Sequence, residues 1–302
     1  MTSSFAPGRS PGRFVPGLVG VALLWAGVGP ARAGAGRDAV AVLIYHHFVS
    51  DQDAARKPGL LDDLTMSRSQ FEAQLELLKQ RSGHPITAME LYGYLKGQAP
   101  LPPRSFLVTI DDGYESIHRI AWPVLKERGV PAAIGLMVKA TEDPERWRAS
   151  HPGSTPHLTW GQIAEMLQPV KVGPTERTLI SIESHTYDRH ENLRGRERKL
   201  PPDRRTEFER GVLDDLKLAR ETIQKRTGLR ESGAFLIWPH GGATKRLLEV
   251  ARQAGHLGTF TILGDAVRPG SDPMAISRIH AGSGVRSIKD LERALDNAGW
   301  GR

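Results

Sequence analysis

The chain has 302 residues with a formal net charge of +7, and it contains no cysteine. The lack of cysteine excludes a fold held by disulfides, and no glycine-rich phosphate turn supports a nucleotide-binding domain. Arg9, Arg13 and Arg32 supply three of the seven charges, which leaves +4 for the rest. No nucleic-acid-binding motif accompanies this charge, so we expect no nucleic-acid partner.

The N-terminal segment has the pattern of a secretory signal peptide. Two arginines precede an apolar run from 14 to 28, and Ala31-Arg32-Ala33 places small residues at both positions that a signal peptidase inspects. The alternative, a membrane anchor, needs roughly 20 uninterrupted apolar residues, whereas a proline and several glycines interrupt this run. We expect a signal peptide at 1–33, a single domain at 34–302 and no transmembrane anchor after cleavage. The protein would be exported, either to the periplasm or out of the cell.

Strand-like and helix-like segments then alternate along the chain. Continuous apolar runs are typical of buried parallel strands, and capping-box pairs such as Ser67 with Gln70 mark helix starts. The strands are predicted at 39–45, 105–110, 132–138, 179–183, 234–238 and 274–279. The helices are predicted after Ser67, Thr87, Thr159, Thr244 and Ser287, and over 117–128 and 205–226.

This alternation predicts one α/β domain, a (β/α) barrel that is distorted or incomplete. An open doubly wound sheet is the alternative fold. A cluster of basic residues lies between Arg189 and Arg210. It is either a solvated loop or a surface that attracts anionic glycan or cell envelope.

Polar residues able to do chemistry follow most of the predicted strands. Because the carboxyl ends of barrel strands open onto one face, residues far apart in sequence meet there. A single histidine in such a place is more often structural, but the recurrence predicts a site. The residues are His46, His47, Asp111, Asp112, His185, His190, His240 and His280.

These residue types suit a hydrolytic metal site. One carboxylate and two imidazoles leave metal positions open for water and substrate. A second carboxylate can take a proton from that water, and a histidine can protonate a departing amine. The sequence offers Asp112, His185 and His190 as metal ligands, Asp111 as base and a histidine as acid. Zn, Co, Ni and Fe all accept this ligand set.

Three motifs resemble those of the polysaccharide deacetylases, the family-4 carbohydrate esterases. Thr109-Ile110-Asp111-Asp112-Gly113-Tyr114 resembles their first motif, T-F-D-D-G. The stretch from Ser184 to His190 resembles the second, and Trp238-Pro239-His240-Gly241 resembles the third. The resemblance implies a metal-dependent N-deacetylase in which the third motif lines the site and a backbone amide there meets the oxyanion.

The departures from these motifs resemble one branch of the family. The two histidines of the second motif are five residues apart instead of four, and Ile237 stands where many members have an arginine that orients the base. The first motif also comes late in the chain. All three features are similar to the branch that deacetylates poly-β-1,6-N-acetyl-D-glucosamine, the biofilm exopolysaccharide, whose domain is circularly permuted. Tyr45-His46 fits the early Tyr-His motif of that branch.

The resemblance implies His46 as the general acid, with His280 as the competitor. Tyr114, Trp238, Pro239 and His240 would line the substrate site, although Trp238 also fits a core position. We expect His47, next to His46, to point away from the cleft by strand alternation. The expected partner is an N-acetylglucosamine polysaccharide, with the polysaccharide export machinery as a further one. The alternatives are a deacetylase of peptidoglycan or chitin oligomers and a glycan-binding protein without catalysis.

Overall fold

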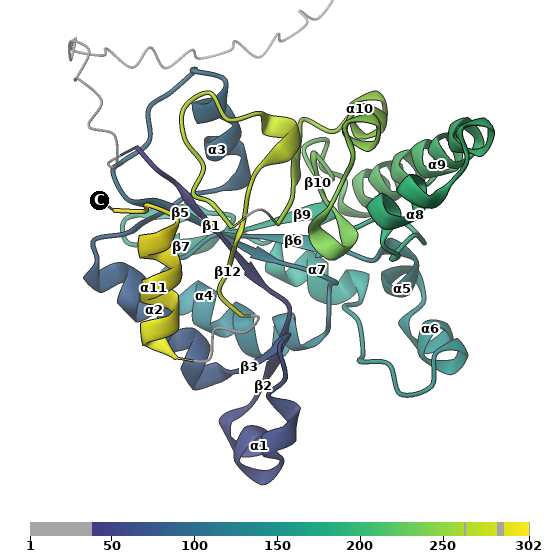
Figure 1. Cartoon of the computed structure of the whole chain (residues 1–302). Coiled ribbons are helices and arrows are strands. Elements are labelled where there is room, and N and C mark those ends of the chain that lie inside the picture. The colour runs from purple at the N-terminus through teal and green to yellow at the C-terminus, as the bar shows by residue number, and fades with distance from the viewer. Residues whose placement is uncertain (1–37, 263, 283–286, 302) are drawn as a thin grey trace, which may run out of the picture. The chain divides into compact units, whose positions relative to one another are not determined.

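Eight parallel strands form one sheet at the centre of the computed structural model (Figure 1). Residues 38–262, 264–282 and 287–301 are described, so the predicted signal peptide lies outside them. The sheet order is β11-β10-β9-β6-β5-β1-β12, and β4 also pairs with β5. The strands are β1 (Ala41–Tyr45), β4 (His84–Pro85), β5 (Ser105–Ile110), β6 (Ala132–Leu136), β9 (Ile180–Ser184), β10 (Phe235–Ile237), β11 (Gly258–Phe260) and β12 (Ile279–His280).

The two ends of this sheet are joined through one residue. Ile276 donates its backbone N–H to the carbonyl of Thr259 (2.9 Å) and accepts from the N–H of Thr261 (2.8 Å). Three residues later the same segment becomes β12 and pairs with β1. The sheet therefore curls into a distorted barrel, which confirms the predicted fold class.

Helices cover the outside of the sheet and one of its ends (Figure 1). In that view α2, α4 and α11 lie together on one side, and α8, α9 and α10 lie on another. The helices are α1 (Asp51–Arg56), α2 (Arg68–Gln80), α3 (Ala88–Leu95), α4 (Trp122–Arg128), α5 (Val138–Glu142), α6 (Pro144–Ser150), α7 (Trp160–Met166), α8 (Leu193–Lys199), α9 (Pro202–Thr227), α10 (Lys245–Gln253) and α11 (Ile288–Asn297).

Short elements connect these parts. A π-helical turn at Ile117–Ala121 leads into α4, and 3₁₀ turns lie at Pro58–Leu60, Pro239–Gly241 and Pro273–Ala275. Two small sheets complete the fold: β2 (His47–Val49) with β3 (Thr65–Ser67), and β7 (Val170–Val172) with β8 (Thr175–Arg177).

The predicted helix starts are confirmed by their capping contacts. Ser67 with Gln70 forms the capping box of α2, and Thr87 with Glu90 forms that of α3. The strand predicted at 274–279 is wrong over most of its length. Pro273 starts a 3₁₀ turn there, because its ring fixes φ and removes a backbone donor. Only Ile276 and β12 keep the expected pairing.

Two layers of apolar side chains separate the inside of the barrel from its outside. Inside, Val42, Leu107 and Phe260 pack together, and Leu91 of α3 closes the end away from the strand C-termini. Outside, alternate strand residues such as Leu43 pack under the helices. The strands read as unbroken apolar runs because both of their faces are buried.

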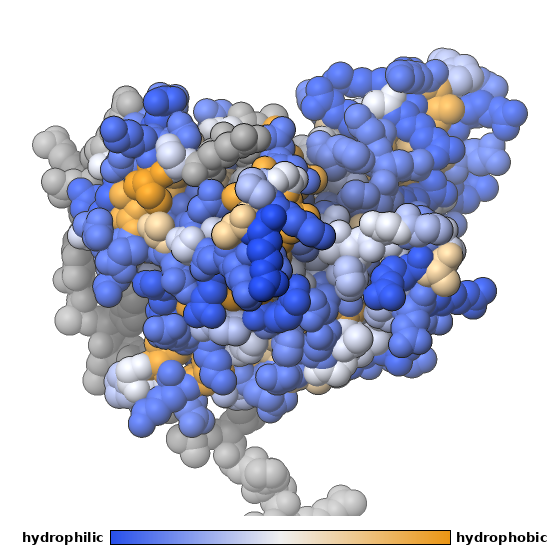
Figure 2. All heavy atoms as spheres, turned by 90° about the horizontal axis from the view of Figure 1, so that it is seen from below, coloured by the Kyte–Doolittle hydropathy of each residue, from blue (hydrophilic) through white to orange (hydrophobic). Residues whose placement is uncertain are grey.

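The surface seen from below in Figure 1 is mostly hydrophilic, with hydrophobic residues in small separate groups (Figure 2). Within the described residues, no helix has both the length and the apolar character needed to cross a bilayer. The predicted basic cluster lies on α8 and the start of α9, where Arg196 pairs with Glu191 and Arg204 pairs with Glu207.

His256, in the loop before β11, should make the stability of the fold depend on pH. The residue is 3% exposed, and its Nδ1 lies 3.0 Å from the carbonyl of Gly233. Burial lowers the pKa of His256 from 6.5 to about 4. The unfolded chain therefore binds a proton near pH 6.5, whereas the folded chain binds it only near pH 4.

The contribution of His256 to the free energy of unfolding should thus be fully present above pH 6.5 and be lost as the pH drops toward 4. A pKa shift of this size corresponds to about 3 kcal/mol. Urea unfolding of the wild type and of His256→Gln between pH 7 and 4 measures this loss. The free energy of unfolding should fall less with decreasing pH in His256→Gln than in the wild type. In His84→Gln, the control at an exposed histidine, it should fall as in the wild type. Equal slopes in all three proteins would contradict the assignment to His256.

Candidate active site

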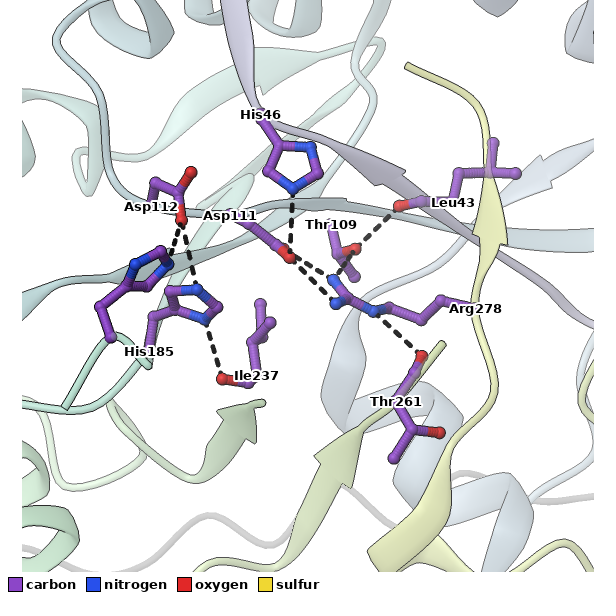
Figure 3. Close-up of polar contacts among 10 residues, drawn as sticks. Leu43, His46, Thr109, Asp111, Asp112, His185, Ile237, Thr261 and Arg278 are labelled. Carbon is purple, nitrogen blue, oxygen red and sulfur yellow. Dashed lines mark hydrogen bonds and ion pairs between the residues drawn. The ribbon is translucent and has the colours of Figure 1, made fainter. Parts of the chain in front are cut away.

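Three side chains from the ends of β5 and β9 meet at one carboxylate oxygen. The Nε2 atoms of His185 and His190 each lie 3.2 Å from Oδ1 of Asp112. One ligand atom from each residue lies within 4.8 Å of the others. Asp112 and His185 are buried, while the side chain of His190 is 33% exposed, so the cluster opens to solvent on one side. Figure 3 shows the imidazole of His185 pointing at the Asp112 carboxylate.

The arrangement fits a divalent metal. Atoms about 2.1 Å from a single ion, at tetrahedral or octahedral angles, lie roughly 3.0–3.4 Å apart. The two 3.2 Å separations match this spacing. Nδ1 of His185 donates to the carbonyl of Ile237 (2.8 Å), so in the neutral ring a lone pair on Nε2 faces the Asp112 carboxylate. Either a proton or a metal ion must then lie between these two acceptors, and the hydrogen bond from Nδ1 to a backbone carbonyl is typical of metal-binding histidines.

The turn after β5 sets the position of Asp112. The N–H of Asp111 still donates to the carbonyl of Tyr45 (2.9 Å) and continues the sheet, but Asp112 and Gly113 both take φ of 70°. A positive φ is uncommon for a residue other than glycine and often marks a functional site. Burial would raise the pKa of Asp112, but its contacts with His185 and His190 outweigh burial and hold it well below its usual range.

The second carboxylate, Asp111, is held by an arginine that lies 167 residues later in the chain. Arg278 donates from Nη1 to Oδ1 (2.6 Å) and from Nη2 to Oδ2 (2.9 Å), and Nη1 also donates to Thr109 (3.0 Å). The Arg278 side chain is fully buried. Burial would raise the pKa of Asp111, but Arg278 and His46 outweigh it, so this pKa is lowered.

Arg278 is the site residue that motif reasoning missed. The third motif has Ile237 in place of an arginine, and Arg278 occupies the position beside Asp111 from the far end of the chain. The sequence pointed to Arg278 in one way, because it lies within an apolar stretch that was predicted to be a strand. Residues two apart in a strand share a face, so Arg278 would face the same side as His280.

The candidate acids lie around Asp111. His46 Nε2 is 3.8 Å from Oδ2 of Asp111, on a different side from Arg278 (Figure 3). His280 pairs with Ile44 in the sheet and is half-buried. Burial is the largest influence on both histidines and lowers the pKa of each. Of the two, His46 is the one in contact with Asp111.

The side chain of His47 packs against Tyr114, which follows the two aspartates of the site. His47 begins β2, and its ring packs edge-on against that of Tyr114 (5.5 Å between centroids). The expectation from strand alternation fails because β1 ends at Tyr45 and the chain enters a different sheet.

The third motif divides between the core and the site. Trp238 is fully buried among α9 and α10 residues, and its Nε1 donates to Thr259 (2.9 Å). Its prediction as a substrate residue is wrong, because a buried ring has no face free for a sugar. Pro239 is buried and starts the turn, whereas His240 is exposed with φ of 55°. The His240 ring lies 5.5 Å from that of His190, so the turn borders the candidate metal site.

The family model for polysaccharide deacetylases matches residues 98–258, which is more than half of the chain. The chain belongs to the polysaccharide deacetylase family. The match contains all three motifs but neither β1 nor β12, so His46 and Arg278 lie outside it.

Proteins similar to this deacetylase include some that are named as N-deacetylases. A poly-β-1,6-N-acetyl-D-glucosamine N-deacetylase of Staphylococcus aureus is 26% identical over 219 residues, which cover 72% of this chain and 68% of the relative. The structure of IcaB from Ammonifex degensii is 25% identical with a TM-score of 0.65, over 87% of this chain and 97% of that one. A de-N-acetylase from Aggregatibacter actinomycetemcomitans has a TM-score of 0.70 at 20% identity, over 85% and 100% of the two chains, and shares the fold.

Replacing Arg278 of the deacetylase by methionine should destabilise the fold by about 3–5 kcal/mol, because Asp111 would remain as an uncompensated buried charge. Adding Asp111→Asn to the same chain should restore much of this loss, since neither charge is then left. Urea unfolding of the wild type, both single variants and the double variant gives the coupling between the two sites. Simple addition of the two single effects would contradict the ion pair.

Proposed function

We propose that this polysaccharide deacetylase removes N-acetyl groups from β-1,6-linked poly-N-acetylglucosamine with the help of one divalent metal. The observation that carries the proposal is the division of roles between adjacent carboxylates. Asp112 faces two imidazoles at metal-ligand spacing, while Asp111 is fixed by Arg278 and turned toward His46. The relatives named for this substrate and the Tyr45-His46 motif support the choice of polymer.

In the proposed reaction Asp112, His185 and His190 would hold the metal. When bound, the metal would lower the pKa of a water molecule and polarise the acetamide carbonyl. Arg278 keeps Asp111 ionised and oriented, so that this carboxylate can take the proton of the attacking water. His46, on another side of Asp111, can protonate the departing amine. The products are acetate and a free amino sugar.

The residues at the rim would orient the sugar. Tyr114 lies between His47 and His157 at the rim of the site, and its pKa is raised to a value well above its usual one by burial and by the nearby Asp112 carboxylate. Its hydroxyl therefore stays protonated and can donate a hydrogen bond. On the other side, the Pro239–Gly241 turn would present a backbone amide to the oxyanion.

Acetate release from defined oligomers tests the substrate and the metal together. The protein is assayed on β-1,6 and β-1,4 N-acetylglucosamine oligomers of equal length, after chelator treatment and after return of Zn, Co, Ni or Fe. We expect release from the β-1,6 series, loss with chelator and recovery with metal. Faster release from the β-1,4 series would favour a chitin-like or peptidoglycan substrate, and no release from either would favour glycan binding alone.

We also propose that the protein is exported, with cleavage after Ala33, and that it meets the polymer near the polysaccharide export machinery. The support is the basic and apolar N-terminal pattern. Mass spectrometry of the mature N-terminus and cell fractionation test this directly. An intact Met1 in the cytosolic fraction would contradict it.

A further inference from the structure

The loop between the two candidate histidine ligands is held at every backbone N–H. From 186 to 189 each amide donates to a side chain, with no water needed to complete the set. The acceptors are Ser184 Oγ for Thr186, Asp215 Oδ1 for Tyr187, Asp215 Oδ2 for Asp188 and Thr186 Oγ1 for Arg189. Thr186 takes φ of 75°, so the loop bends sharply just after His185.

Asp215 of α9 contributes both oxygens to this arrangement. It accepts from two consecutive amides of the loop at 2.9 Å each, in the way that a helix-capping carboxylate does. One turn earlier on the same face of α9, the carbonyl of Gly211 accepts from Nε of Arg189 (3.1 Å). A Cβ on Gly211 would lie 2.7 Å from Nη2 of Arg189, so a larger residue there would require the end of the Arg189 side chain to shift.

The start of α5 holds the loop from another direction. The N–H of Val138 donates to the carbonyl of Thr186 (3.2 Å), and the N–H of Lys139 donates to that of Tyr187 (3.0 Å). The ammonium of Lys139 also pairs with the carboxylate of Asp188. These contacts, all made by groups of the protein itself, hold the loop between α5 and α9.

We propose that Asp215 is a positioning residue that sets the metal affinity of the deacetylase, because it fixes His190 relative to His185 before metal arrives. The inference rests on the proposed ligand set. Two histidines separated by a bent loop are not placed by a common helix, so their spacing depends on what anchors the loop. With both amides bound to Asp215, the loop is ordered during folding and metal binding need not order it.

The test is a titration with Co²⁺, whose visible absorption reports the coordinated ion, on full-length variants freed of metal. In Asp215→Ala the apparent dissociation constant should rise by roughly 10- to 100-fold, as for other residues that orient metal ligands. Asp215→Asn keeps one carbonyl oxygen but turns its NH₂ toward an amide, so its effect should be intermediate. Asp214→Asn is the matched control, since Asp214 is the exposed neighbour on α9, and its affinity should equal that of the wild type.

Turnover at saturating metal separates positioning from catalysis. Because Asp215 does not reach the reacting atoms, kcat of Asp215→Ala should approach that of the wild type once Co²⁺ saturates it. Unchanged Co²⁺ affinity in Asp215→Ala, with only a lower melting temperature of the metal-free protein, would overturn the inference. His190→Ala is titrated in parallel: if that variant also binds Co²⁺ normally, the proposed ligand set itself has failed.

Discussion

Asp111→Asn should lower acetate release by roughly 10²-fold or more while leaving metal binding intact. An amide cannot take the proton of the attacking water, yet the two imidazoles and Asp112 that form the candidate metal site are untouched. Asp112→Asn should instead lose metal and activity together, because its Oδ1 is the atom that both imidazoles face. The two neighbouring carboxylates should thus have different roles, Asp111 in proton transfer and Asp112 in metal binding.

The measurement pairs metal content per chain with turnover in the same preparations. Because Asp111→Asn leaves the buried Arg278 short of a charged partner, thermal unfolding must first show that the variant is folded. Parallel loss of metal and activity in Asp111→Asn would mean that the two aspartates have the opposite roles.

His46→Ala should cause a large loss of turnover on an amide substrate and a small one on an activated ester. An amine leaves poorly unless it is protonated, whereas an activated alkoxide leaves without a proton, so only the general acid should show this contrast. The structure favours His46 because its Nε2 lies 3.8 Å from Asp111, at the heart of the proposed site.

His280→Ala and His47→Ala are the matched comparisons. His280 lies on the neighbouring strand β12, and His47 packs against Tyr114 at the rim. Both should lower amide and ester turnover to similar extents. If turnover on the amide alone fell in His280→Ala and not in His46→Ala, His280 would be the general acid. The main support for a permuted domain would then be lost.

Local sequence signals predicted the barrel well. Strands buried on both faces are continuous apolar runs, and Ser105–Ile110 was predicted with the bounds that the structure shows. Helix starts are decided by side chains three residues apart, which a sequence displays directly, as at Ser287 and Asp290. The strand β11 was missed because it is only three residues long and begins with Gly258, so it lacks a periodic pattern.

The candidate site was predictable only where its residues belong to motifs. Asp112, His185 and His190 follow strands whose ends must meet, and the structure brings them together. Arg278 and Asp215 were not found, because each acts through a partner far away in sequence. Trp238 shows the reverse error: its motif borders the site, but alternation along β10 directs its ring outward into the packing under α9 and α10.

The segment that joins the two ends of the barrel also carries Arg278. Within this segment β12 pairs with β1, whose residues lie far away in the sequence. Such long-range pairing is slow to form, because distant parts of the chain must first come together. Until this pairing forms, all three candidate metal ligands are in the chain but no guanidinium lies beside Asp111. The carboxylate that we propose as the base should therefore be held by Arg278 only after β12 has paired with β1.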